Sequence, residues 1–151
     1  MALKSDRIEL LTDISFFMTT TAERGGVVCT DTSGSGVSMD DANAVVKYAA
    51  AVSGSKPVGV LLNDVVDLDL TRQHINWHKD EMQKGGKVTL LRIGQVTTNM
   101  LVSGISPGAG TPAYVGASGL IGTSSTNAVQ IGTFLGGKDA DGYAKVSVNI
   151  A

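Results

Sequence analysis

The sequence is short of the residue types on which most active sites depend. Only 5% of its 151 residues are aromatic, two are histidine, and the single cysteine, Cys29, has no partner for an internal disulfide. The segment VVCTD around Cys29 is typical of a small, buried strand residue rather than of a nucleophile or a metal ligand. A core made mainly of Val, Ala, Leu and Ile favours strands over a cofactor pocket, and we expect no cofactor.

The sequence also lacks a strong net charge and long apolar runs. Its net charge is −2, and its 12 basic residues are scattered, so no basic stripe is present to bind a phosphate backbone. No run approaches the roughly 18 apolar residues of a membrane span. Charges between Lys4 and Asp13 interrupt any signal-peptide core. We therefore expect a soluble protein that binds neither nucleic acid nor a membrane.

The two histidines are the first candidates for a metal site. His74 and His78 are four residues apart, so on a helix both imidazoles would share one face. The motif HINWH lacks the glutamate that acts as the base in zinc peptidases, and no third ligand follows from the spacing. Two solvated histidines are the simpler interpretation, and we predict no metal site. A zinc enzyme built on these histidines and nearby carboxylates is the alternative.

Three glycine-rich loops imitate ligand-binding motifs without completing them. Residues 132–139, GTFLGGKD, have Asp139 where a phosphate-binding loop needs Ser or Thr. Residues 108–113, GAGTPA, precede a strand-like AYV instead of the helix that a dinucleotide site needs. Residues 139–142, DADG, begin a calcium loop without its distal glutamate. We reject the first match, interpret the other two loops as turns and predict that the protein is not an enzyme.

The sequence is rich in glycine and in short apolar runs. It contains 19 glycines, and from Met100 onward strand-like runs alternate with Gly, Ser, Pro and Thr. This spacing predicts an all-β fold, a small barrel or sandwich. Residues 85–99, GGKVTLLRIGQVTTN, predict two strands that meet at a bend or tight turn marked by glycines such as Gly94. Residues 40–52 suit either a helix or a strand.

We expect one β-rich domain, residues 25–151, preceded by an extended N-terminal arm, residues 1–24. Residues 71–84 form a polar excursion from this domain. The apolar arm needs cover from its own domain or from a neighbouring subunit. In the excursion, a tryptophan is either a protein contact or folds back onto the core. The candidate partner-binding residues are Ile8, Leu10, Ile14, Phe16, Phe17, Ile75 and Trp77.

Several features follow one another in order between Pro57 and Ile150. They are PVGVLL, GGKVTLLRIGQVTTN, GTPAYVGASGLIG and QIGTFLGGKDADGYAKVSVNI. In this order they resemble the head decoration (cement) proteins of tailed bacteriophages. The resemblance implies a β-barrel or β-tulip-like domain that binds the outside of an expanded capsid as an oligomer, a homotrimer in preference to a dimer. It also implies that the partner is the major capsid protein and that no catalytic residues are present.

From this resemblance we expect synthesis in a bacterial host cytoplasm and a final location on the outer capsid surface of the virion. A tail-associated structural protein of the tube or fibre has the same composition and is the alternative. We further expect the apolar segment Ile8–Met18 to add a strand to a neighbour's open sheet edge, because main-chain pairing supplies affinity without demanding specific side chains.

Overall fold

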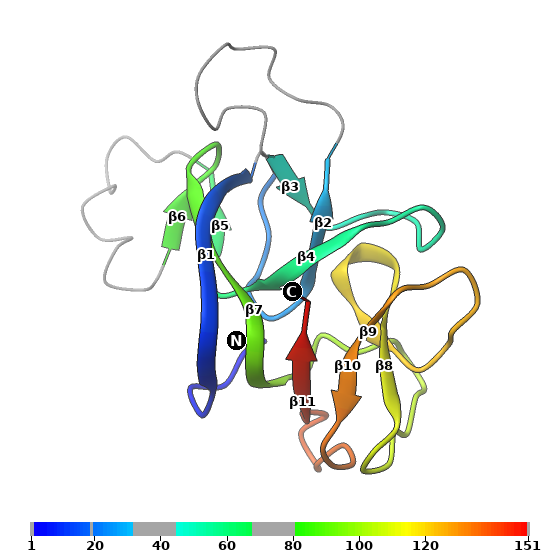
Figure 1. The fold of residues 1–151 in the computed structure, drawn as a ribbon. Helices are drawn as coiled ribbons and strands as arrows, with labels where there is room; N and C mark the ends of the chain where they lie inside the picture. The colour runs from blue at the N-terminus through cyan, green and yellow to red at the C-terminus, as the bar shows by residue number, and fades with distance from the viewer. Residues whose placement is uncertain (1, 19, 32–44, 68–80, 151) are drawn as a thin grey trace.

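The chain is built almost entirely of β-strands (Figure 1). The computed structural model describes residues 2–18, 20–31, 45–67 and 81–150. The strands are β1 (Ile8–Met18), β2 (Val27–Thr30), β3 (Val45–Lys47), β4 (Pro57–Leu61), β5 (Asp64–Val66), β6 (Glu81–Gln83), β7 (Lys87–Thr98), β8 (Pro112–Val115), β9 (Ile121–Gly122), β10 (Gln130–Phe134) and β11 (Ala144–Asn149). A short 3-10 helix, η2 (Ala117–Gly119), precedes β9. The predicted all-β class is confirmed.

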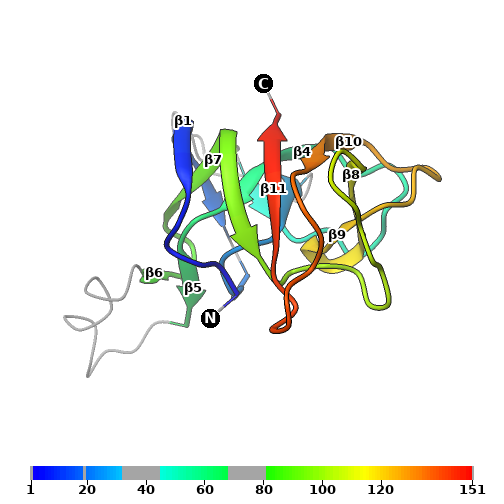
Figure 2. The same cartoon turned by 90° about the horizontal axis from the view of Figure 1, so that it is seen from below.

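Nine of the strands form one mixed sheet in the order β1-β3-β2-β4-β7-β11-β10-β8-β9. Strand β1 also pairs with β7, so β1, β3, β2, β4 and β7 follow one another in a closed ring of pairings. Strands β5 and β6 form a separate parallel pair. Figures 1 and 2 show β1 and the β8–β9 pair on opposite flanks of the molecule. The barrel or tulip shape stays a prediction.

Strand β7 connects the two halves of the sheet. One of its edges pairs with β1, and the other pairs first with β4 and then with β11. Its side chains enter two core clusters. Leu91 and Val96 pack in the larger cluster with Phe134, while Val88 and Leu90 pack in the smaller one. Leu90 and Leu91 are adjacent and both buried, so the strand is covered on both faces at this point, which explains the departure from strict alternation there.

The prediction of two strands within residues 85–99 is wrong, because β7 runs through Gly94 without a break. A Cβ atom on Gly94 would lie 2.1 Å from the carbonyl oxygen of Ile8 in β1. Glycine is needed here for the close approach of two strands and not for a turn. The tight turn lies earlier, where Gly85 has a φ of +88° and the Gly86 N–H donates to the carbonyl oxygen of Gln83 at 2.9 Å.

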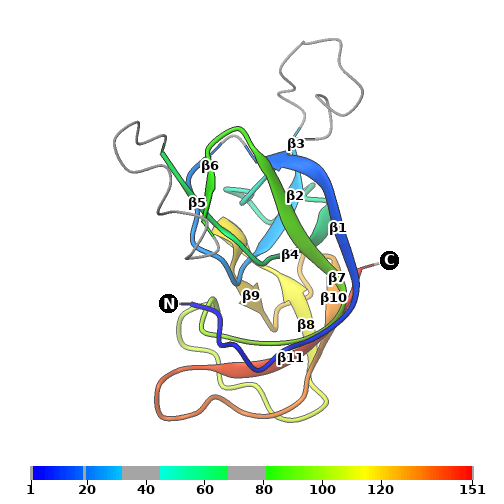
Figure 3. The same cartoon turned by 90° about the vertical axis from the view of Figure 1, so that its left-hand side faces the viewer.

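Much of the predicted arm, residues 1–24, lies in the same sheet as the rest of the chain. Figure 3 shows β1 running beside β7, with which it pairs from Ile8 to Phe17. At Phe17 and Met18 it also pairs in parallel with β3. Strand β7 of the same chain therefore takes the main-chain pairing along one edge of this segment, and its addition to a neighbour's sheet through the other edge stays a prediction. Leu3, just before β1, is only 1% exposed.

Two other predictions concern short segments. Cys29 lies in β2 and is 1% exposed, so its prediction as a buried strand residue is confirmed. Within residues 40–52, Val45–Lys47 form the strand β3, and residues 40–44 lie outside the described residues. Across the described ranges, no helix combines the length and the apolar character needed to span a membrane.

Candidate interaction surface

The large apolar side chains that remain exposed are concentrated on β1. Among the described residues, six large apolar side chains are exposed, and four of them lie between residues 8 and 14. Their exposed fractions are 50% for Ile8, 73% for Leu10, 45% for Leu11 and 66% for Ile14. These four residues are called the β1 apolar face below. Exposed apolar side chains gathered on one strand are a candidate protein contact site.

Three of the predicted partner-binding residues, Ile8, Leu10 and Ile14, belong to the β1 apolar face. Leu11 also belongs to it and was not predicted. Strict alternation along a strand would turn Leu11 to the face opposite Leu10. The sequence therefore offered no signal that both leucines would be exposed.

Phe16 and Phe17, which were also predicted, do not belong to this surface. Phe16 is partly buried against the smaller core cluster. Phe17 is also partly buried, and the ammonium nitrogen of Lys87 lies 5.4 Å from the centroid of its ring. The prediction of Phe16 and Phe17 as partner-binding residues is thus not supported by their positions, because the chain's own residues cover them. Ile75 and Trp77 lie outside the described residues, as do both histidines.

Bulges in β1 explain why neighbouring side chains are exposed together. Glu9 pairs with Gly94 and Leu11 with Ile93, so β1 advances two residues where β7 advances one. Leu10 is the extra residue. Two more irregularities follow, the last of them between Asp13 and Phe16. Bulges re-aim side chains and increase local twist, which breaks the alternation that would have hidden half of these residues.

One main-chain donor near the end of β1 is already occupied by a side chain. The main-chain N–H of Ser15 donates to Oδ1 of Asp13 at 2.8 Å, and the Ser15 hydroxyl donates to the same oxygen at 2.5 Å. Bulges discourage edge-to-edge pairing, and an occupied donor removes one main-chain hydrogen bond from it. A partner is therefore expected to contact the side chains of the β1 apolar face and not the strand edge.

An arginine from β7 fixes β1 in place. Nη1 of Arg92 lies 3.4 Å from Oδ2 of Asp13, and Nε of Arg92 donates to the carbonyl oxygen of Ile150 at 3.0 Å. The side chain therefore ties β1 to the residue that follows β11. Burial by itself would raise the pKa of Asp13. The hydrogen bonds from the hydroxyl and amide of Ser15, together with the bond and charge of Arg92, outweigh it and lower this pKa below 3.8.

We expect Asp13→Asn to destabilise the protein near neutral pH but much less in acid. The folded pKa of Asp13 lies below its unfolded value of 3.8, so its stabilisation is complete above that value and is lost as the pH falls through the folded pKa. Urea unfolding of both proteins at about pH 7 and about pH 2 measures the difference. A difference in unfolding free energy that stays constant with pH would show that the charge of Asp13 contributes nothing.

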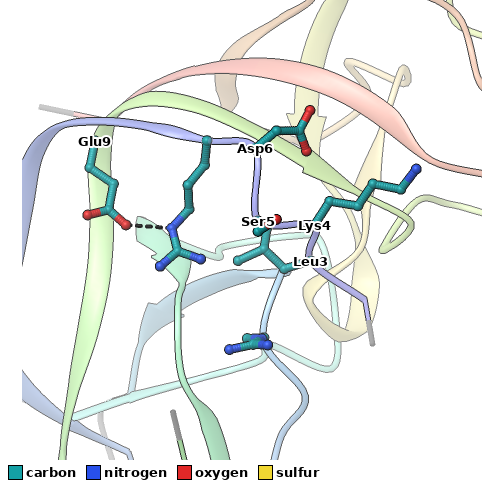
Figure 4. A pocket seen from close by; sticks show the side chains of 7 residues that line it. Leu3, Lys4, Ser5, Asp6 and Glu9 are labelled. Atoms are coloured by element: carbon teal, nitrogen blue, oxygen red, sulfur yellow. Dashed lines mark hydrogen bonds and ion pairs between the residues drawn. The ribbon is translucent and has the colours of Figure 1, made fainter. Parts of the chain in front are cut away.

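A wide charged depression lies beside the start of β1 (Figure 4), with a volume of about 950 Å³. Three basic and two acidic residues line it. Nε of Arg7 donates to Glu9 at 2.6 Å, and Nζ of Lys4 lies 3.4 Å from Asp139 outside the depression. Figure 4 shows Asp6 and Glu9 pointing away from each other. The two carboxylates therefore form no acid–base pair, and we assign no chemistry to this depression.

Residues 108–113 and 139–142, which imitate ligand-binding motifs, contain turns, as predicted, while residues 132–134 of the third loop belong to β10. Oδ1 of Asp139 accepts the N–H groups of Asp141 and Tyr143, each at 2.9 Å. The N–H of Thr111 donates to the carbonyl oxygen of Gly108 at 3.1 Å just before β8. Burial of Cys29 raises the pKa of its thiol, which disfavours the reactive thiolate. Within the described ranges, no three metal-ligating side chains are grouped to hold an ion.

Comparison of the sequence with protein-family models and with curated proteins finds no match for this chain. Two observations therefore bear on the function of this chain. The first is the β1 apolar face, which is a property of the described structure. The second is the ordered set of sequence features between Pro57 and Ile150.

Proposed function

We propose that this chain is a structural virion protein that binds the outer surface of a tailed-phage capsid and stabilises the lattice of the major capsid protein. The observation that carries the proposal is the β1 apolar face, four aliphatic side chains exposed on one strand of 11 residues. The resemblance between Pro57 and Ile150 supplies the identity of the partner. Protein binding needs such a surface and needs no catalytic group.

The physical properties of β1 suit this function. The strand pairs with β7 from Ile8 to Phe17, so its side chains are held on a rigid sheet and lose little freedom when a partner binds. A capsid offers the same site many times, so modest contacts become strong when several copies act together. A protein that binds only the assembled shell stabilises the shell by mass action.

We expect Leu10→Ser to weaken binding to expanded capsid shells by about tenfold or more, because loss of a central apolar contact costs more than 1 kcal/mol. Leu10 is 73% exposed, so the substitution leaves the core intact. Co-sedimentation with shells purified without this protein measures the affinity. Leu135→Ser, the same change at a leucine that is 41% exposed just after β10, is the matched control and should bind normally. Equal binding by both variants would remove β1 from the contact.

The copy number in purified virus particles tests the location. Quantitative peptide mass spectrometry gives the ratio of this chain to the main shell protein. A ratio near one, or a simple fraction of it, is expected for a protein bound throughout the lattice. A handful of copies per particle would favour the tail-associated alternative, and complete absence from particles would overturn both virion functions.

A further inference from the structure

The β1 apolar face lies among charged side chains, and their arrangement bears on the kind of partner that it fits. Glu9 lies between Ile8 and Leu10 in β1, and Asp13 lies beside Ile14. A surface that covers these aliphatic side chains therefore comes close to two carboxylates. Each carboxylate would lose part of its contact with water, which is costly for a charge that has no partner.

Each of these two carboxylates is paired with an arginine of the same chain. Nε of Arg7 lies 2.6 Å from Oε1 of Glu9, which Figure 4 marks with a dashed line, and Nη1 of Arg92 lies 3.4 Å from Oδ2 of Asp13. The carboxylate side chains stay accessible, with exposed fractions of 37% for Glu9 and 20% for Asp13. The negative charges at the β1 apolar face are therefore neutralised within the chain before a partner binds.

The end of the β1 apolar face at Ile8 is balanced in charge as well. Ile8 shares a small hollow of about 220 Å³ with Asp6, Arg7, Gln95 and Lys145. Because Arg7 is already paired, one acidic and one basic side chain remain in the described lining of this hollow, and their charges cancel. The surroundings of the face therefore combine exposed aliphatic side chains with paired or balanced charges.

We infer that the β1 apolar face fits an apolar, uncharged patch of the major capsid protein, and that Arg7 and Arg92 determine this specificity by neutralising the two carboxylates. The inference rests on the proposed capsid function and names the chemistry of the partner surface. A charged patch would be a poor partner, because it would meet no complementary charge on β1 and would lose its own contact with water. Burial of apolar surface therefore supplies most of the affinity.

The first test is the salt dependence of wild-type binding to expanded shells. Dissolved NaCl screens attraction between opposite charges, and this contact contains no such attraction between chain and capsid. In co-sedimentation we expect the affinity to change less than about twofold between about 50 mM and about 500 mM NaCl. Sodium sulfate, which strengthens the burial of apolar surface, should raise the affinity.

The second test removes one arginine. Arg7→Gln leaves Glu9 without this partner beside the contact, so we expect shell binding to fall about tenfold or more. The double variant Arg7→Gln/Glu9→Gln removes both charges and should recover most of the loss. Lys56→Gln removes the same charge from an exposed residue just before β4 and should bind as the wild type does. An ion pair at the surface contributes little to stability, so all three variants should melt within about 2 °C of the wild type.

Three results would overturn the inference and leave the proposed function standing, because in each of them the wild type still binds shells. The first is wild-type binding that weakens by more than about twofold over this range of NaCl, which would indicate a charged capsid patch. The second is binding of Arg7→Gln that equals or exceeds that of the wild type. The third is a loss in Arg7→Gln that the double variant does not recover, which would mean that Arg7 itself contacts the shell. A wild type that binds no shells at any salt concentration would instead overturn the proposed function, and this inference with it.

Discussion

Replacement of Gly132 by alanine is expected to lower the free energy of unfolding by about 3 kcal/mol or more, the upper end for forcing extra atoms into a packed site. Gly132 lies in β10, and a Cβ atom there would lie 1.8 Å from the carbonyl oxygen of Ser147 and 2.9 Å from its carbonyl carbon. These atoms belong to the main chain of the paired strand β11. They cannot rotate away as the end of a side chain can, so the strands must separate locally.

The separation would reach the larger core cluster. Ile131 and Phe134, on either side of Gly132 in β10, are both fully buried in that cluster. Strand β10 also has β8 on its other edge, so it has no free side toward which it could shift. The damage is therefore expected to be global rather than confined to one hairpin.

Thermal unfolding provides the measurement for Gly132→Ala. A loss of about 3 kcal/mol corresponds to a fall in Tm of roughly 9 °C for a chain of this length. The matched control is Gly136→Ala, a few residues further along, where no atom lies within 4 Å of the added Cβ. The control should melt within about 2 °C of the wild type. Equal melting of the two variants would mean that β10 and β11 do not approach this closely in solution.

The parts of the fold that the sequence predicts well depend on local patterns. The alternation at the end of the chain is an example. In β11, Ala144, Val146 and Val148 are buried, while Lys145 and Asn149 are exposed, as expected for a half-buried strand. Alternation of this kind can be recognised in a sequence because each residue's burial depends on the direction of its own side chain relative to one sheet face.

The parts that the sequence could not predict depend on what lies opposite in space. A glycine within an apolar run indicates either a turn or the close approach of another backbone, and only the partner strand decides between them. Gly94 was assigned to a bend or tight turn and is instead a point of close approach by Ile8, some 86 positions earlier in the chain. Gly94 divides the apolar residues of β7 into two groups, which is why one long strand was predicted as two short ones.

The candidate interaction surface was also only partly predictable from the sequence. The apolar residues of β1 were identified from composition, but their exposure depends on bulges that have no sequence signature. The ion pair that holds β1 against β7 joins Asp13 to Arg92, which are 79 positions apart. Neither residue belongs to a recognisable motif, so this ion pair was not predicted. Leu11 was not among the predicted contact residues, although it follows Leu10 in the same apolar segment.

Replacement of Gly94 by alanine is expected to release the first half of β1 from β7 while the larger core stays folded. The added Cβ would lie 2.1 Å from the carbonyl oxygen of Ile8 and 3.0 Å from Cδ1 of Leu91. The end of the leucine side chain can move, but the main-chain oxygen cannot without loss of the pairing between β1 and β7. From Ile8 to Phe16, β1 pairs with β7 alone among the described strands, so this part of β1 can move away from β7.

Hydrogen exchange followed by mass spectrometry measures this release. Peptides from residues 2–18 are expected to exchange about 100-fold faster in Gly94→Ala, which corresponds to a local loss of about 3 kcal/mol. Peptides from β10 and β11 should keep their protection. Gly104→Ala is the matched control, because Gly104 has a φ of +80° and no atom lies within 4 Å of the added Cβ. Gly104→Ala therefore has the cost of an alanine at positive φ, about 1 kcal/mol, but its Cβ overlaps no other atom.

The same variant connects the position of β1 to its function. If the β1 apolar face is the contact with the capsid, Gly94→Ala should lose shell binding to the same extent as Leu10→Ser, although it keeps all four aliphatic side chains. The loss would then come from their altered placement, because apolar side chains on a detached segment must be ordered again on binding. Faster exchange in residues 2–18 with undiminished shell binding would show that the capsid does not require β1 in the position seen here. Normal exchange with lost binding would instead place the contact at Gly94 itself.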